Sequence, residues 1–78
     1  MRGDAKGNRV LGREIAKVRK RAGMSQEELA FQAEVHPTYV SQLERGLKSP
    51  TVNVLLRLAK ALKASGSRLI AVVERNSH

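Results

Sequence analysis

The residues whose side chains are best suited to recognise a ligand lie in the segment 37–45. Thr38 and Gln42 are four residues apart, so on a helix they share one face. A glutamine amide can bond both N6 and N7 of an adenine, and a threonine offers a hydroxyl and a methyl group to a base edge. Val40 and Leu43 fall on the other, apolar face of the same helix. A short helix of this kind can present hydrogen-bonding groups outward while it packs on a core.

The charge balance indicates a polyanionic partner. The 78 residues include 15 Lys and Arg but only 7 Asp and Glu, which gives a formal net charge of +8. Such an excess in a small chain favours nucleic-acid binding. The absence of cysteine excludes a disulfide scaffold and thiolate zinc sites, and it favours the reducing cytoplasm. The longest apolar run, residues 69–73, is too short for a membrane span or a signal-peptide core.

The sequence lacks a set of side chains suited to catalysis or metal binding. Its two histidines, His36 and His78, have no second histidine or carboxylate at a recognised catalytic or metal-ligand spacing. Glu27 and Glu28 stand at the expected start of a helix, where negative charge complements the helix dipole. We therefore expect no enzymatic activity, no metal and no cofactor.

The apolar periodicity predicts one small all-α domain. Helices are expected over residues 10–22, 26–33, 37–45 and 52–62. Residues 1–9 show no apolar periodicity, so they are expected to form a flexible basic arm. Residues 68–75 are β-branched enough for a strand, but a fifth helix is favoured in an otherwise helical chain. The domain is thus expected to span 10–75, with a dimerisation segment at about residues 65–75.

Local signals predict where the helices begin and which residues point inward. Ser25 and Glu28 form an S-x-x-E capping box. Pro37 suits the first position of a helix, where its missing N–H is not needed, and Thr51 is the expected N-cap of the next helix. The expected core residues are Leu11, Ile15, Val18, Leu29, Ala30, Ala33, Val40, Leu43, Leu55, Leu58, Ala59 and Leu62.

Two short helices separated by about three residues, after a longer basic helix, form the helix-turn-helix pattern. The matching stretches, in order between residues 11 and 69, are LGREIAKVRKRAGMSQEELA, VHPTYVSQLERG and SPTVNVLLRLAKAL. On these stretches the chain resembles the lambda-repressor/Cro-like family of DNA-binding regulators, also called the xenobiotic-response-element type. The resemblance implies a compact bundle of four or five helices whose third helix enters the major groove of double-stranded DNA.

The resemblance also implies roles for individual residues. A phosphate contact is implied for Gln26, and base contacts are expected from the outward residues of the third helix, Thr38, Gln42, Pro37, Ser41 and Tyr39. Their places at the ends of the third helix add Lys48, Arg45 and His36 as expected phosphate contacts. Tyr39 can equally cover the bundle, and Arg45 can equally remain a solvated cation at a helix end. Arg19 and Glu44 occupy the positions of a partly buried ion pair between the first and third helices, so we assign them to the scaffold.

Two residues depart from the family pattern. Glu34 stands where many members carry glycine, at a turn position expected to have positive φ, which costs a non-glycine residue roughly 1–2 kcal/mol. Pro37 stands where relatives often use glutamine to read a base. Because proline offers only apolar contact with thymine methyl groups, the operator of a relative cannot be transferred to this chain.

Surplus apolar residues predict self-association. Val54 and Leu56 fall off the core stripe of the helix 52–62, and residues 69–73 are apolar on all sides. The expected dimer contacts are Leu56, Leu69, Ile70, Val72 and Val73. A two-fold homodimer would bind a pseudo-palindromic operator. The alternative is an antitoxin-type or assembly module whose main partner is another protein, such as a toxin or polymerase, with DNA binding used for autoregulation.

Overall fold

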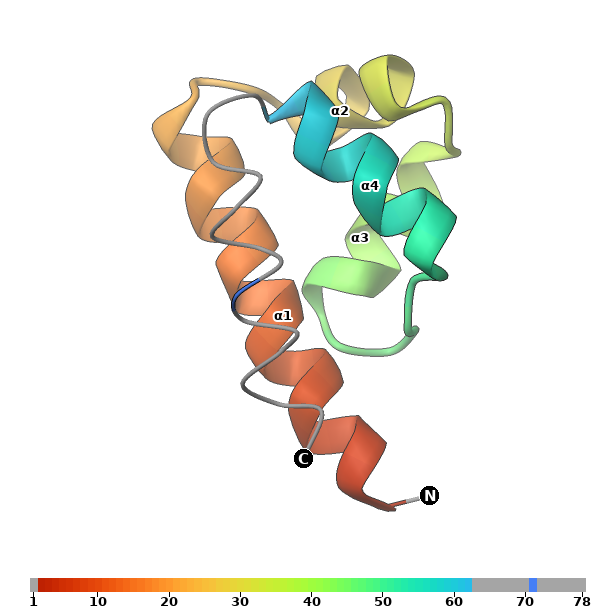
Figure 1. The fold of residues 1–78 in the computed structure, drawn as a ribbon. Helices are drawn as coiled ribbons and strands as arrows, with labels where there is room; N and C mark the ends of the chain where they lie inside the picture. The colour runs from red at the N-terminus through yellow and green to blue at the C-terminus, as the bar shows by residue number, and fades with distance from the viewer. Residues whose placement is uncertain (1, 63–70, 72–78) are drawn as a thin grey trace.

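The computed structural model of the chain describes residues 2–62 and residue 71. Its elements are α1 (Arg2–Arg21), α2 (Gln26–Ala33), α3 (Pro37–Glu44) and α4 (Val52–Ala61). In Figure 1, α1 forms one long side of the molecule and the three shorter helices lie together beside it. α1 packs on α3, α3 on α2, and α2 on α4. The predicted all-α bundle is confirmed.

The interior is built from one apolar stripe on each helix. Every residue that the sequence placed in the core is buried, and Ala61 joins them. Val54 differs from expectation, because it is half-buried and packs against the core rather than lying off the stripe. Four residues before Leu58, it falls at the edge of the buried face. Leu56 remains exposed, as do Phe31, Leu47 and Val52.

Side-chain caps begin the three short helices. Ser25 Oγ accepts a hydrogen bond from Glu28 N at 3.0 Å, while Glu28 Oε1 accepts one from Ser25 N at 2.7 Å, so the predicted capping box is confirmed. Thr51 Oγ1 accepts from Val54 N at 3.1 Å at the start of α4, as expected. These bonds satisfy backbone N–H groups that have no partner inside the helix. Local chemistry therefore sets where α2 and α4 begin.

The predicted start of the first helix at residue 10 is wrong, because α1 already begins at Arg2. Residues 2–9 are thus helical, although the sequence indicated an arm without regular structure. The turn at Gly46, after α3, lies against this part of α1: a Cβ placed on Gly46 would come within 2.9 Å of Arg9 Cα. Once α1 has formed, each residue added at its start forms one more backbone hydrogen bond, which favours extension of the helix toward the N-terminus. This packing involves residues distant in sequence and leaves no local signal.

α1 and α3 approach each other closely at Gly12. This glycine is buried, and a Cβ there would overlap the backbone carbonyl oxygens of Leu43 and Glu44 at the end of α3. Only a residue without a side chain lets the two helices touch at this point. The contact fixes the end of α3 on α1, and therefore the direction in which the outer edge of α3 faces.

The other helix ends agree with the sequence prediction to within one residue. α2 has the predicted bounds, whereas α3 and α4 end at Glu44 and Ala61, one residue early. The predicted segment 68–75, with its helix and strand alternatives and with Leu69, Ile70, Val72 and Val73, lies outside the described residues apart from Ala71. In the part of the chain that the structure describes, no helix combines the length and apolarity needed to cross a membrane.

Candidate nucleic-acid interface

The two edges of α3 differ in burial as the candidate interface requires. Val40 and Leu43 are completely or almost completely buried, while Thr38 is exposed. Ser41 and Gln42 are half-buried, so each leaves part of its surface accessible three or four residues along the helix from Thr38. Because the inner edge is held by the core, the outer edge is presented on a rigid support.

The residues that flank this edge have mixed roles. Pro37 occupies the first turn of α3 and is half-buried. Tyr39 is also half-buried and packs against the core, so part of this residue contributes to the packing of the helices. Tyr39 therefore has less freedom to meet a ligand than Thr38.

His36 caps α3. Its Nδ1 accepts a hydrogen bond from Thr38 N at 3.1 Å, and its side chain is exposed. An imidazole that accepts through Nδ1 carries its proton on Nε2, which is then a donor. The cap thus leaves one N–H of the ring available at the start of α3, where a phosphate oxygen could accept it.

Arg19 and Glu44 form a buried ion pair between α1 and α3. Arg19 Nε donates to Glu44 Oε2 at 2.6 Å and Nη2 donates to Oε1 at 3.0 Å, while Nη1 donates to the carbonyl oxygen of Met24 at 2.8 Å. The two side chains are only 10% and 6% exposed. The hydrogen bonds to Glu44 raise the pKa of the Arg19 guanidinium above its ordinary value, although burial opposes the rise. This is the pairing that the resemblance implied.

Gln26, the first residue of α2, belongs to the same group of side chains. Its Nε2 donates to Glu44 Oε1 at 2.9 Å, so the amide is held toward the end of α3. The residue is half-buried. A primary amide has a second N–H, and this one can donate to a ligand at the start of α2.

The remaining candidate phosphate contacts follow α3. Arg45 is the C-cap of this helix and Lys48 lies in the loop after it, and both side chains are exposed. Further exposed cations lie on α1, namely Arg9, Arg13, Lys17, Lys20 and Arg21. The accessible edge of α3 thus begins at Thr38 in its first turn, and the two cations follow at and beyond its last turn.

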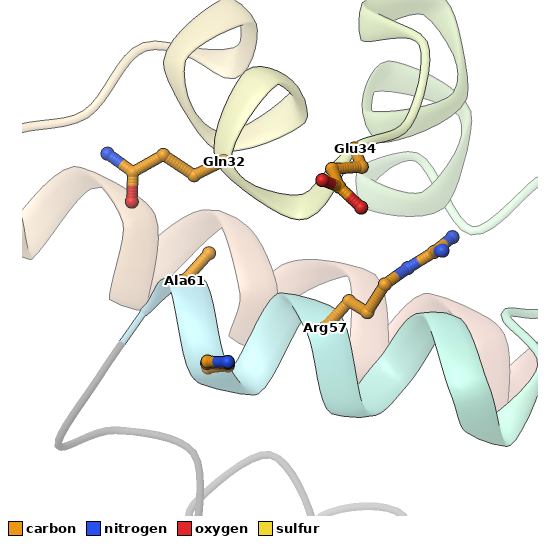
Figure 2. A pocket seen from close by; sticks show the side chains of 5 residues that line it. Gln32, Glu34, Arg57 and Ala61 are labelled. Carbon is orange, nitrogen blue, oxygen red and sulfur yellow. The ribbon is translucent and has the colours of Figure 1, made fainter.

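Glu34 adopts the strained conformation that the sequence predicts. It ends α2 with φ 61° and ψ 44°, and it is the one residue other than glycine with positive φ among the described residues. Its exposed carboxylate borders a hollow of about 400 Å³ between α2 and α4. Figure 2 shows Glu34 and Arg57 extending toward this space from the two helices. No predicted site residue lines the hollow.

Sequence reasoning missed the bond between Gln26 and Glu44. The two residues are 18 positions apart and share no motif that couples them. That Gln26 and Glu44 lie close together becomes evident only in the three-dimensional structure, where Arg19 holds Glu44 near the start of α2. Sequence reasoning likewise did not single out Phe31, which is 86% exposed on α2.

Known proteins share both the sequence pattern and the fold. The helix-turn-helix family model matches residues 15–69. The uncharacterized HTH-type transcriptional regulator y4dJ of Sinorhizobium fredii is 37% identical over 62 residues, which cover 80% of each chain. The control protein C.BamHI of Bacillus amyloliquefaciens is 35% identical over 68% of this chain and 67% of its own length.

A solved structure shows the same arrangement. The restriction-modification controller protein C.AhdI from Aeromonas hydrophila superposes with a TM-score of 0.76 and 32% sequence identity, over 80% of this chain and 94% of that chain. The matched residues include the end of α1 from Ile15 onward and the whole of α2, α3 and α4. The chain therefore belongs to the helix-turn-helix family of the xenobiotic-response-element type, whose members are DNA-binding transcriptional regulators and not enzymes.

Proposed function

We propose that the chain binds a pseudo-palindromic operator as a homodimer, with α3 of each subunit in a major groove. The observation that carries this proposal is the contrast between the two edges of α3. Val40 and Leu43 are buried, while Thr38 is exposed and Gln42 partly so. A major groove about 12 Å wide admits one helix, and the residues of its N-terminal turns reach the base edges.

Thr38 and Gln42 are the proposed main base contacts. They lie one helical turn apart on the accessible edge, so they would face neighbouring base pairs. The amide of Gln42 can bond an adenine in bidentate fashion, whereas Thr38 can meet a thymine methyl group or accept a hydrogen bond. Ser41, Pro37 and Tyr39 would complete the contact at its sides.

The proposed phosphate contacts surround this edge. Lys48 and Arg45 are exposed beyond the end of α3 and would neutralise phosphates on one strand. Gln26 and His36 stand at the starts of α2 and α3 and each keep a donor after their internal hydrogen bonds. Such contacts hold the protein on the duplex without reading its sequence.

Apolar residues on α4 support the dimer. Leu56 is 52% exposed and Val52 precedes it by one helical turn, so both lie on one outer face of α4. We assign this face, with Leu69, Ile70, Val72 and Val73 of the proposed dimerisation segment at about 65–75, to the subunit interface. Two-fold pairing would place the two recognition helices about 34 Å apart, one turn of DNA. The dimer is expected to act in the cytoplasm.

Selection of bound sites from a random pool of duplexes tests the proposal. We expect two inverted half-sites, and we expect Thr38→Ala and Gln42→Ala each to weaken binding by about 1–3 kcal/mol and to relax the preference at one position. Lys48→Ala is the matched control, because losing a phosphate contact weakens binding to all sequences alike. Unchanged site preference in both α3 variants would refute the assignment of α3 as the reading helix.

A second candidate role is favoured by the exposure of Phe31. This ring on α2 lies outside the core and outside the α3 edge. An antitoxin-type or assembly module would use such a surface for another protein, a toxin or polymerase, and bind DNA for autoregulation. Purification of the untagged chain from its own cells would distinguish the two roles. A stoichiometric second protein that Phe31→Ser releases supports the alternative, whereas the homodimer alone supports the simpler regulator.

A further inference from the structure

The carboxylate of Glu44 joins three helices at one point. Its Oε1 accepts from both Arg19 Nη2, at 3.0 Å, and Gln26 Nε2, at 2.9 Å, while its Oε2 accepts from Arg19 Nε. Arg19 belongs to the last turn of α1, Gln26 opens α2, and Glu44 is the last residue of α3. One carboxylate thereby connects the base-reading helix with the helix start proposed to hold a phosphate.

We propose that Glu44 is a positioning residue for DNA binding: it orients the amide of Gln26 so that the second N–H of this amide donates to a phosphate. The proposal rests on the phosphate contact of Gln26 proposed above. An unrestrained glutamine side chain has three rotatable bonds and loses rotamer freedom when it binds. With one N–H already held by Glu44, the amide plane is set before DNA arrives.

A carboxylate near a phosphate would ordinarily oppose binding. Here Arg19 neutralises Glu44 through two hydrogen bonds, and the Glu44 side chain is only 6% exposed. Its negative charge is therefore balanced within the protein, and the remaining effect on Gln26 is directional. Arg19 thus has a second role besides holding α1 to α3, because it neutralises the charge of Glu44 near the proposed phosphate contact.

The same connection relates the phosphate contact to the base contacts. Glu44 follows Gln42 by two residues on α3, and the end of α3 is pressed on α1 at Gly12. Fixing Gln26 to Glu44 therefore fixes the distance from the phosphate to the reading edge. A phosphate contact fixed in this way sets the register of α3 relative to the DNA bases as soon as the protein docks on the DNA backbone.

A double-mutant cycle between Gln26 and Glu44 tests the proposal. The dissociation constant for an operator obtained by site selection is measured by fluorescence anisotropy for wild type, Gln26→Ala, Glu44→Gln and the double variant. Hydrogen bonds to charged groups are strong enough that each single change should weaken binding about tenfold or more. Because Glu44 acts through Gln26, the double variant should bind no more weakly than the weaker single variant.

Lys48→Ala supplies the matched control for the cycle. It removes another proposed phosphate contact that shares no hydrogen bond with Glu44 in the described structure. Its loss should therefore multiply with that of Glu44→Gln. A purely structural role for Glu44 would instead weaken binding by the same factor in all backgrounds, including that of Gln26→Ala.

A second measurement needs no variant that could fail to fold. In the ¹⁵N-labelled wild-type protein, the two side-chain amide protons of Gln26 should be widely separated in chemical shift and exchange slowly. Addition of operator DNA should shift the proton that does not face Glu44. Side-chain amide signals like those of a free glutamine would overturn the proposal.

The outcomes separate this proposal from the one on which it rests. If Gln26→Ala leaves the affinity unchanged, the phosphate contact is wrong and the positioning role of Glu44 is wrong with it. If Gln26→Ala weakens binding but Glu44→Gln weakens it equally with and without Gln26, the phosphate contact stands and positioning is refuted. Non-additivity confined to the Gln26 and Glu44 pair supports both.

Discussion

Replacement of Arg19 by methionine removes one partner of the buried ion pair while keeping much of the volume of the side chain. Glu44 would then lose two hydrogen bonds and its counter-charge, and the carbonyl of Met24 would lose a donor. Since the Glu44 side chain is 6% exposed, water cannot easily replace these partners. The bond from Gln26 would remain and would partly satisfy the carboxylate.

The expected loss follows from this geometry. Removing one partner of a buried pair typically costs 3–5 kcal/mol. Because Gln26 still donates to Glu44, we expect the lower end, about 3 kcal/mol. For a domain of this size, that loss corresponds to a decrease in melting temperature of roughly 12–24 °C. Such a change is a large fraction of the total stability of a small domain.

Thermal unfolding followed by circular dichroism measures the effect, at a fixed protein concentration because a dimer melts in a concentration-dependent way. Arg13→Met is the matched control, since Arg13 is exposed on the same helix and should change the melting temperature little. Replacing both partners, as in Arg19→Met with Glu44→Met, should recover part of the loss because no unpaired charge stays buried. If Arg19→Met has the same melting temperature as the wild-type protein, the scaffold role of the ion pair is wrong.

Three further predictions concern the turn, a helix crossing and the DNA complex. Glu34→Gly should leave the melting temperature unchanged or raise it, because glycine adopts positive φ freely; Glu27→Gly, at an exposed helical position, should lower it, and a clear fall for Glu34→Gly would contradict the strain argument. Gly12→Ala should destabilise the fold by about 1–3 kcal/mol in denaturant unfolding, since the new methyl group meets the backbone of α3; a wild-type midpoint would show that the helices can separate freely. Operator affinity should fall by roughly 10³–10⁵ between 50 and 200 mM salt if several phosphates are contacted, as a titration series would measure, and a flat salt dependence would rule those contacts out.

Much of the fold could be predicted from the sequence because its signals are local. The bounds of α2 follow from the Ser25 and Glu28 capping box at one end and a turn with positive φ at the other. The buried stripes follow from apolar spacing, since a helix repeats every 3.6 residues. The outward edge of α3 follows in turn, because Val40 and Leu43 leave only one face for polar residues.

Other features could not be predicted in this way. The start of α1 was misjudged because residues 2–9 carry no apolar repeat, whereas Arg9, the last of them, lies against the Gly46 turn. Val54 was assigned to the surface, yet it reaches the core from the edge of α4. The contact at Arg9 comes from a distant turn and leaves no local signal, whereas Val54 lies four residues before Leu58 and its place at the edge of the buried face depends on how widely the core covers α4.

The amino-acid sequence by itself determined the starts of the three short helices, the inward faces and the family, because caps, periodicity and motif spacing act within a few residues of chain. Tertiary structure alone decided that Gly12 brings α3 onto α1, and that the amide of Gln26 is held by Glu44 rather than by solvent. Such contacts join residues 18 or more positions apart. They exist only after hydrophobic packing has brought the helices together, which is why no local pattern encodes them.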